Sequence, residues 1–214
     1  MLDRKNFYID GKWVSPKEPR NHKVIDPSNE EICAEISLGG KKDVDKAVSA
    51  AKKAFETWAF SKKEERLDLL EKLYVVYKKR WAEMAKLISL EMGAPMKFST
   101  EMQAATGASH IKSFKNILKD FNFEKDLGEE KNNQKLLYEP KGVCALITPW
   151  NWPINQVNLK VIPALASACT VVLKPSEVAP LSSMLLAEMI DEVKFPAGVF
   201  NLVNGDGALT GDAL

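Results

Sequence analysis

Three polar groups in the last third of the chain follow short apolar runs, and their types could do chemistry together. Asn151 lies within residues 147–153, where two prolines and two tryptophans restrict the backbone around a single amide side chain. Lys174 and Glu177 follow the next run, and a glycine turn at 204–207 follows the last. An amide, a lysine beside a carboxylate and a glycine turn that opens a helix are groups that can hold a ribose and a pyrophosphate.

Alternating strands and helices must position these groups. The apolar runs are typical of strands buried on both faces and cover residues 143–148, 170–174 and 199–203. Between them the pattern predicts one helix over 153–168, with Pro163 in its middle, and a second that starts near Pro180. The order β-α-β-α-β predicts right-handed crossovers and a parallel sheet. Such a sheet binds ligands at the carboxyl ends of its strands, so we expect all three groups at one edge.

The second helix is predicted to have one buried face and one polar face. Its apolar stripe runs from Leu181 to Val193 at helical spacing. The opposite face is expected to carry Ser182, Ser183, Glu188, Asp191 and Glu192.

The first 120 residues predict a hairpin and then helices. Residues 7–14 contain Asp10-Gly11, a pair typical of a tight hairpin turn. Apolar residues at helical spacing follow, first from 44 to 58 and then from 67 to 88. Packing in a core is enough to explain both stripes.

Four motifs together resemble the NAD(P)-dependent aldehyde dehydrogenase superfamily. They are Ile147-Thr-Pro-Trp-Asn-Trp-Pro153, Pro163-Ala-Leu-Ala166, Thr170-Val-Val-Leu-Lys-Pro-Ser-Glu177 and Pro196-Ala-Gly-Val-Phe-Asn-Leu-Val-Asn-Gly-Asp-Gly207. The resemblance implies an α/β fold with a Rossmann-like parallel sheet as cofactor domain, here partial, preceded by an N-terminal hairpin and helices. It also implies oxidation of an aldehyde to a carboxylic acid with NAD as cofactor and NADP as the alternative.

The resemblance assigns Asn151 a catalytic role. Its side-chain NH2 would bind the aldehyde oxygen while a cysteine attacks the carbonyl carbon. The alternative is a turn asparagine that bonds its own backbone. Trp152, Asn155 and Leu159 would line the aldehyde channel, and Asn155 would make that channel partly polar.

The resemblance also implies a set of cofactor contacts. Lys174 and Glu177 would hold the adenosine ribose hydroxyls; alternatively, they are an exposed strand-end lysine and a glutamate that favours a helix dipole. A carboxylate at this ribose predicts a preference for NAD over NADP. Gly205 is expected to supply only a positive φ. The full set of expected cofactor contacts is Ile147, Thr148, Pro149, Trp150, Lys174, Glu177, Gly207 and Gly211.

The chain is expected to divide into three parts. Residues 1–122 form the N-terminal part of the cofactor domain, 123–142 an oligomerisation hairpin, and 143–214 the truncated β-α-β-α-β core. The hairpin segment is charged and polar between apolar flanks, which alone indicates a surface loop or hairpin. By resemblance, the complete protein is a homodimer or homotetramer.

Composition excludes several partners. With 30 basic and 29 acidic residues the formal charge is +1, so no nucleic-acid footprint is visible. The longest apolar stretch, 161–173, is too short to span a bilayer, and the N-terminus carries no apolar signal core, which predicts a cytoplasmic protein. No metal-ligand spacing occurs. The cysteines, which are expected to be reduced, are Cys33, Cys144 and Cys169.

The resemblance places the cysteine nucleophile and the glutamate base of the family beyond Leu214. No cysteine in this chain has a histidine nearby in the sequence, and neither His22 nor His110 is a promising catalytic residue. The chain is therefore expected to be an inactive fragment, from a truncated gene or a partial read, that supplies cofactor and oxyanion contacts only. The rival hypothesis is a non-catalytic module that binds a nucleotide or a partner subunit.

A sheet that stops after its third strand is expected to leave an edge uncovered. We expect that edge along residues 199–203, with the apolar faces of Val199, Phe200, Leu202 and Val203 exposed.

Overall fold

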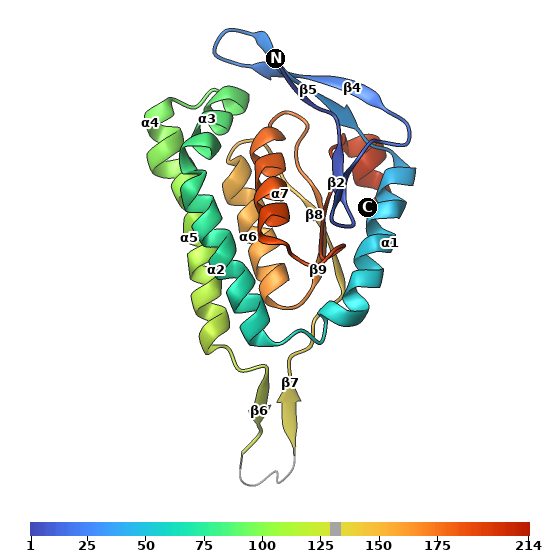
Figure 1. Ribbon diagram of the computed structural model, residues 1–214, viewed down its shortest axis with the longest axis vertical. Coiled ribbons are helices and arrows are strands. Elements are labelled where there is room, and N and C mark those ends of the chain that lie inside the picture. Colours follow the sequence, from blue (N-terminus) through green and yellow to red (C-terminus); the bar gives the residue numbers. More distant parts are fainter. Residues whose placement is uncertain (129–133) are drawn as a thin grey trace.

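A five-stranded sheet with the strand order β3-β2-β10-β9-β8 lies at the centre of the fold (Figure 1). The computed structural model describes residues 1–128 and 134–214. Strands β8 (Val143–Ile147), β9 (Thr170–Lys174) and β10 (Phe200–Leu202) are parallel and adjacent. The predicted α/β fold and its parallel sheet are confirmed.

Helices α6 (Pro153–Ala166) and α7 (Leu181–Val193) connect the parallel strands, close to the predicted bounds. Ser182 and Ser183 are fully buried, so their placement on an exposed face of α7 was wrong. The reason is that α7 is covered on two sides: the sheet packs against one side and α2 (Lys63–Lys79) packs against another. Periodicity along one helix does not reveal a second layer that comes from a distant part of the chain.

The N-terminal hairpin consists of β2 (Phe7–Ile9) and β3 (Lys12–Val14). Asp10 and Gly11 take φ values of 55° and 70°, which two-residue hairpin turns of type I′ require, so the predicted turn is confirmed. Strand β2 continues the sheet by pairing antiparallel with β10, with Tyr8 opposite Leu202.

This pairing overturns the prediction of an open edge along residues 199–203. Val199, Phe200, Leu202 and Val203 are all buried, because β2 covers one side of β10 and helices cover the faces. Among the described residues the sheet instead ends at β8, where Ala145 and Ile147 are exposed. The expectation of strands buried on both faces therefore holds for β9 and fails for β8.

Two helix layers and a second sheet complete the body. Helix α1 (Lys41–Trp58) packs against β8, β9 and β10, while α6 and α7 lie on the other face of the sheet (Figure 1). The predicted stripe over 67–88 is divided at Arg80 between α2 and α3 (Trp81–Met92), because Arg80 leaves helical geometry with ψ at 17°. The second sheet has the order β1-β5-β4, with β1 (Leu2–Arg4), β4 (Arg20–Asp26) and β5 (Glu31–Leu38).

The remaining elements lead from the helices into a hairpin that extends away from the body (Figure 1). They are α4 (Met96–Phe98), the π-helical turn η1 (Ser99–Gln103), α5 (Ala104–Asp120), and the antiparallel strands β6 (Glu124–Asp126) and β7 (Lys135–Leu137). Residues 129–133 of the predicted hairpin segment lie outside the described residues. No helix in the described part of the chain is both long and apolar enough to cross a membrane.

Candidate functional site

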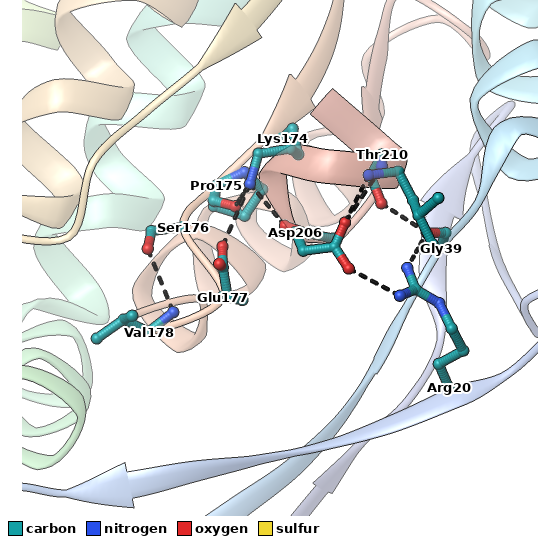
Figure 2. Close-up of polar contacts among 11 residues, drawn as sticks. Arg20, Gly39, Lys174, Pro175, Ser176, Glu177, Val178, Asp206 and Thr210 are labelled. Atoms are coloured by element: carbon teal, nitrogen blue, oxygen red, sulfur yellow. Dashed lines mark hydrogen bonds and ion pairs between the residues drawn. The ribbon is translucent and has the colours of Figure 1, made fainter. Parts of the chain in front are cut away.

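The carboxyl ends of the parallel strands meet at one edge of the sheet, as predicted. Ile147 is in register with Lys174, and the backbone N–H of Thr148 donates to the carbonyl of Lys174 at 3.2 Å. The Lys174 side chain reaches across to the turn after β10, close to Asp206 (Figure 2). There Nζ donates to the carbonyl of Gly205 at 2.6 Å. Backbone from all three strand ends therefore lies within hydrogen-bonding distance of Lys174.

Lys174 and Glu177 form a partly accessible pair. The Lys174 side chain is only 4% exposed, and Nζ also donates to the carbonyl of Pro175 at 3.0 Å. Its contact with Glu177 Oε2 is the longest of the three at 3.4 Å, and the Glu177 side chain is partly exposed. Both backbone carbonyls are fixed acceptors, so the carboxylate is the partner that a ligand can displace. A hydroxyl placed between them would accept from the ammonium and donate to the carboxylate.

The glycine turn after β10 has one closed side and one open side. A Cβ at Gly205 would lie 1.8 Å from Thr210 Oγ1, whereas a Cβ at Gly207 would meet nothing within 4 Å. The expectation that Gly205 supplies a positive φ was wrong, because its φ is not in the left-handed region. Gly205 is instead required by the close approach of Thr210. Gly207 leaves the backbone accessible, and Gly211 faces Lys174 and Ile147 at ordinary contact distances.

Asp206 caps the helical turn η3 (Gly207–Gly211), and sequence reasoning did not select it. Its Oδ1 accepts from the backbone N–H of Leu209 at 2.8 Å. Burial alone would raise the pKa of Asp206, but Arg20 and the backbone N–H donors outweigh it and lower that pKa. An aspartate directly before a helix is a known capping signal that could have identified it. Arg20, which lies far away in the sequence, gave no such signal.

The loop after β8 presents Asn151 to solvent. The Asn151 side chain is exposed, and among the described residues it has no hydrogen-bond partner. Pro149 and Trp150 beside it are also exposed. Thr148 is buried, and its Oγ1 has no partner among the described groups. The amide of Asn151 is thus available to a ligand, in contrast to a turn asparagine that bonds its own backbone.

Of the three residues predicted to line a channel, Trp152 directly precedes α6, and Asn155 and Leu159 lie in its first two turns. Trp152 makes an edge contact with Phe98, with ring centroids 5.5 Å apart, and Leu159 is exposed. Asn155 Oδ1 lies 2.7 Å from Nε2 of His110 on α5. With Oδ1 as the acceptor, His110 donates from Nε2, and the NH2 of Asn155 stays available as a donor. His110 therefore contacts one of the residues expected to line the channel, which its position in the sequence did not indicate.

The described residues do not show an activated thiol. Burial raises the pKa of Cys33, and burial with the neighbouring Cys169 raises the pKa of Cys144 to about 11. Cys169 itself is buried. A nucleophilic cysteine needs a lowered pKa, so the raised pKa values of Cys33 and Cys144 disfavour that role for them, and burial leaves the Cys169 thiol inaccessible. Within residues 1–128 and 134–214, no group of three or more His, Cys, Asp or Glu side chains is placed to hold a metal ion.

Comparison with known proteins identifies a family. The model of the aldehyde dehydrogenase family matches residues 13–214. Over the whole chain, 50% of residues are identical to 3-succinoylsemialdehyde-pyridine dehydrogenase of a Pseudomonas species, of which the chain covers 44%. It thus spans less than half the length of this relative.

Solved structures agree with this result. An aldehyde dehydrogenase from Bartonella henselae superposes with a TM-score of 0.97 at 56% identity; the match covers 100% of this chain and 45% of that one. A variant of aldehyde dehydrogenase C from Pseudomonas syringae, solved with NAD+ and octanal, gives a TM-score of 0.94 at 42% identity, over 98% of this chain and 42% of that one.

Proposed function

The chain belongs to the aldehyde dehydrogenase family, and from this premise we propose that it supplies the cofactor and oxyanion contacts for NAD-dependent oxidation of an aldehyde to a carboxylic acid. The observation that carries the proposal is the meeting of Lys174, Glu177 and the glycine turn at one edge of a parallel sheet. The rest of the reaction needs a nucleophile and a base, which we expect in the part of its relatives that this chain does not cover.

The residues at the sheet edge fit a dinucleotide. Lys174 and Glu177 would hold the adenosine ribose, and the open side of Gly207 lets a ligand approach the backbone. The proposed contact surface is completed by Gly211, Pro149, the exposed Ile147 and Trp150, and the hydroxyl of Thr148, which has no partner among the described residues. When bound, the nicotinamide supplies the hydride acceptor. The solved Pseudomonas syringae relative with NAD+ supports the same cofactor here.

Asn151 would act on the aldehyde oxygen. Its exposed amide would donate to the oxygen as negative charge develops there, which lowers the barrier to attack on the carbonyl carbon. The neighbouring prolines and tryptophans hold its backbone, so little ordering is needed at the moment of reaction.

We propose that the substrate carries a second hydrogen-bonding group besides the aldehyde. Two observations support this class. The Asn155–His110 pair places a polar donor among Trp152, Leu159 and Phe98, and the Pseudomonas relative at 50% identity is named for a semialdehyde with a pyridine ring. Octanal in the Pseudomonas syringae structure is a purely aliphatic alternative.

Three further features remain proposals. The first is the division of the chain into residues 1–122, 123–142 and 143–214. The second is that the hairpin β6–β7 takes part in forming a homodimer or homotetramer, which the exposed apolar side chains of Leu136, Leu137 and Tyr138 support. A cytoplasmic location agrees with the predicted reduced state of the cysteines.

Two measurements test the proposed function. Isothermal titration calorimetry of the 214-residue protein should detect NAD and AMP binding, because the adenosine contacts lie within this chain. NADH formation with a panel of aldehydes should be absent for this chain and present for a protein extended to the length of its relatives. Binding without turnover in the extended protein would favour a non-catalytic nucleotide-binding module. NADH formation by the short chain that survives Asn151→Ala would contradict the assigned roles.

A further inference from the structure

We propose that Arg20 is a positioning residue of the cofactor site. It lies at the start of β4, far from the glycine turn in sequence, and holds that turn in the shape that receives the adenosine half of the cofactor. The inference rests on the proposed function and adds to it a residue from the N-terminal sheet.

One guanidinium binds two separate segments (Figure 2). Nη1 of Arg20 donates to Asp206 Oδ2 at 2.7 Å, and Nη2 donates to the carbonyl of Gly39 at 2.8 Å. Gly39 follows β5, and Asp206 lies in the turn after β10. The planar fork of arginine suits such a double contact, because its donors are fixed relative to one another.

The contact with Arg20 orients the carboxylate of Asp206. Because Oδ2 is held by Arg20, Oδ1 faces the start of η3, where it accepts from the N–H of Leu209 and, at 3.5 Å, from that of Thr210. The Asp206 carbonyl also accepts from the N–H of Gly211 at 3.0 Å. Loss of Arg20 would free the carboxylate to rotate and weaken the cap of the turn.

On the side where Arg20 binds, the glycine turn is closed off by further contacts to Gly39. Thr210 Oγ1 donates to the Gly39 carbonyl at 2.5 Å, and the Gly39 N–H donates to the carbonyl of Asn204 at 2.8 Å. Thr210 is fully buried against Gly205. The open position at Gly207 is left for the ligand. Arg20 therefore acts on the turn from its closed side, through Asp206.

The partial exposure of the Arg20–Asp206 ion pair predicts that its loss will change ligand affinity more than global stability. The side chains of Arg20 and Asp206 are 37% and 27% exposed, and ion pairs of this kind contribute little to global stability. The effect is expected in ligand affinity, which depends on the geometry of the turn. Arg4 offers a matched control, because it pairs with Glu188 at side-chain exposures of 33% and 20% and lies in the same small sheet.

The test compares Arg20→Met, Arg20→Lys and Arg4→Met by calorimetric titration with AMP and with NAD, beside the melting temperature of each variant. Arg20→Met should raise the Kd for both ligands about fivefold, with a melting temperature close to that of the wild type. Arg20→Lys should recover part of the affinity, because one ammonium can hold Asp206 without the fork to Gly39. Arg4→Met should bind as the wild type does.

A double variant tests the route through the carboxylate. Asp206→Asn keeps an oxygen for the cap but loses the charge that Arg20 binds, so it should weaken AMP binding. In the Asp206→Asn background, Arg20→Met should raise the Kd for AMP little further. Unchanged AMP affinity in Arg20→Met, or equal weakening in Arg4→Met, would overturn the inference. If the wild type binds neither AMP nor NAD, the proposed function fails first, and this inference fails with it.

Discussion

Asn151 is the residue through which the chain would touch the reacting aldehyde. Its amide is exposed and has no partner among the described residues, so its removal should leave the fold intact. In a protein extended to the length of its relatives, Asn151→Ala should lower kcat by roughly 10²–10³, the usual loss for one oxyanion donor. Steady-state kinetics measure this, with the exposed Asn116→Ala on α5 as control. A kcat within twofold of the wild type would remove Asn151 from the reaction.

Glu177 is expected to set the choice of cofactor. Its carboxylate, partly exposed and 3.4 Å from Lys174, would accept a bond from a ribose 2′-hydroxyl and repel a 2′-phosphate. Glu177→Gln should therefore raise kcat/KM for NADP relative to NAD in the extended protein, while Lys174 still attracts the phosphate. The control is Glu192→Gln on the exposed side of α7. An unchanged ratio of the two cofactors would place Glu177 outside the ribose site.

At the scale of elements, α7 depends on a carboxylate from another helix. The side chain of Pro180 cannot cap α7; instead the buried Glu91 at the end of α3 accepts from the backbone N–H of Leu181 and, at 3.1 Å, from that of Ser182. Glu91→Ala would leave both N–H groups buried without an acceptor, so we expect the free energy of unfolding to fall by about 2–4 kcal/mol. Denaturant titration measures this. A loss below about 0.5 kcal/mol would show that the cap contributes little.

The same residue predicts a pH dependence. Burial raises the pKa of Glu91 from 4.5 to about 7, although the N–H donors of Ser182 and Leu181 oppose the shift. Because the folded protein then holds a proton that the unfolded chain releases, this group's contribution to stability falls as pH rises from 4.5 to about 7 and is constant above. Glu91→Gln should remove that slope, and Glu192→Gln should keep it. Denaturant titrations at pH 5 and pH 8 compare the three proteins.

The local elements could be predicted from sequence more fully than the contacts between them. Strand β9 was predicted to the residue, because a β-branched run ends at a lysine before a proline. The hairpin turn at Asp10-Gly11 was equally clear. By contrast, the burial of Ser182 depends on α2, and Arg20 and His110 make their contacts with partners far away in the chain. No periodicity or turn signal encodes such pairs.

At the scale of the whole molecule, the open edge of β8 predicts self-association. Among the described residues, no strand pairs with β8 on the side away from β9, and Ala145 is exposed there. Uncovered edges pair with other chains, and a lysine on the edge opposes this. Light scattering after size exclusion, over a range of concentrations, should show oligomers that Ala145→Lys reduces and Ala82→Lys, on the surface of α3, does not.

Two results would contradict this prediction. A monomer at every concentration would show that the edge is protected. Oligomers that persist in Ala145→Lys would place the contact elsewhere, and the hairpin β6–β7 would be the next surface to test.

The pairing of β2 with β10 sets the order of events during synthesis. Tyr8 leaves the ribosome long before its partner Leu202 is made, because the two residues lie far apart in the sequence. The N-terminal hairpin therefore lacks its sheet partner until β10 has been made. A contact of such long sequence separation also forms slowly, because a long loop has to close first. Helices α1 to α5 need only local bonds and can form earlier. We therefore expect the insertion of β10 between β2 and β9 to follow the formation of these helices, and this step joins β2 to the parallel strands and brings Asp206 to Arg20.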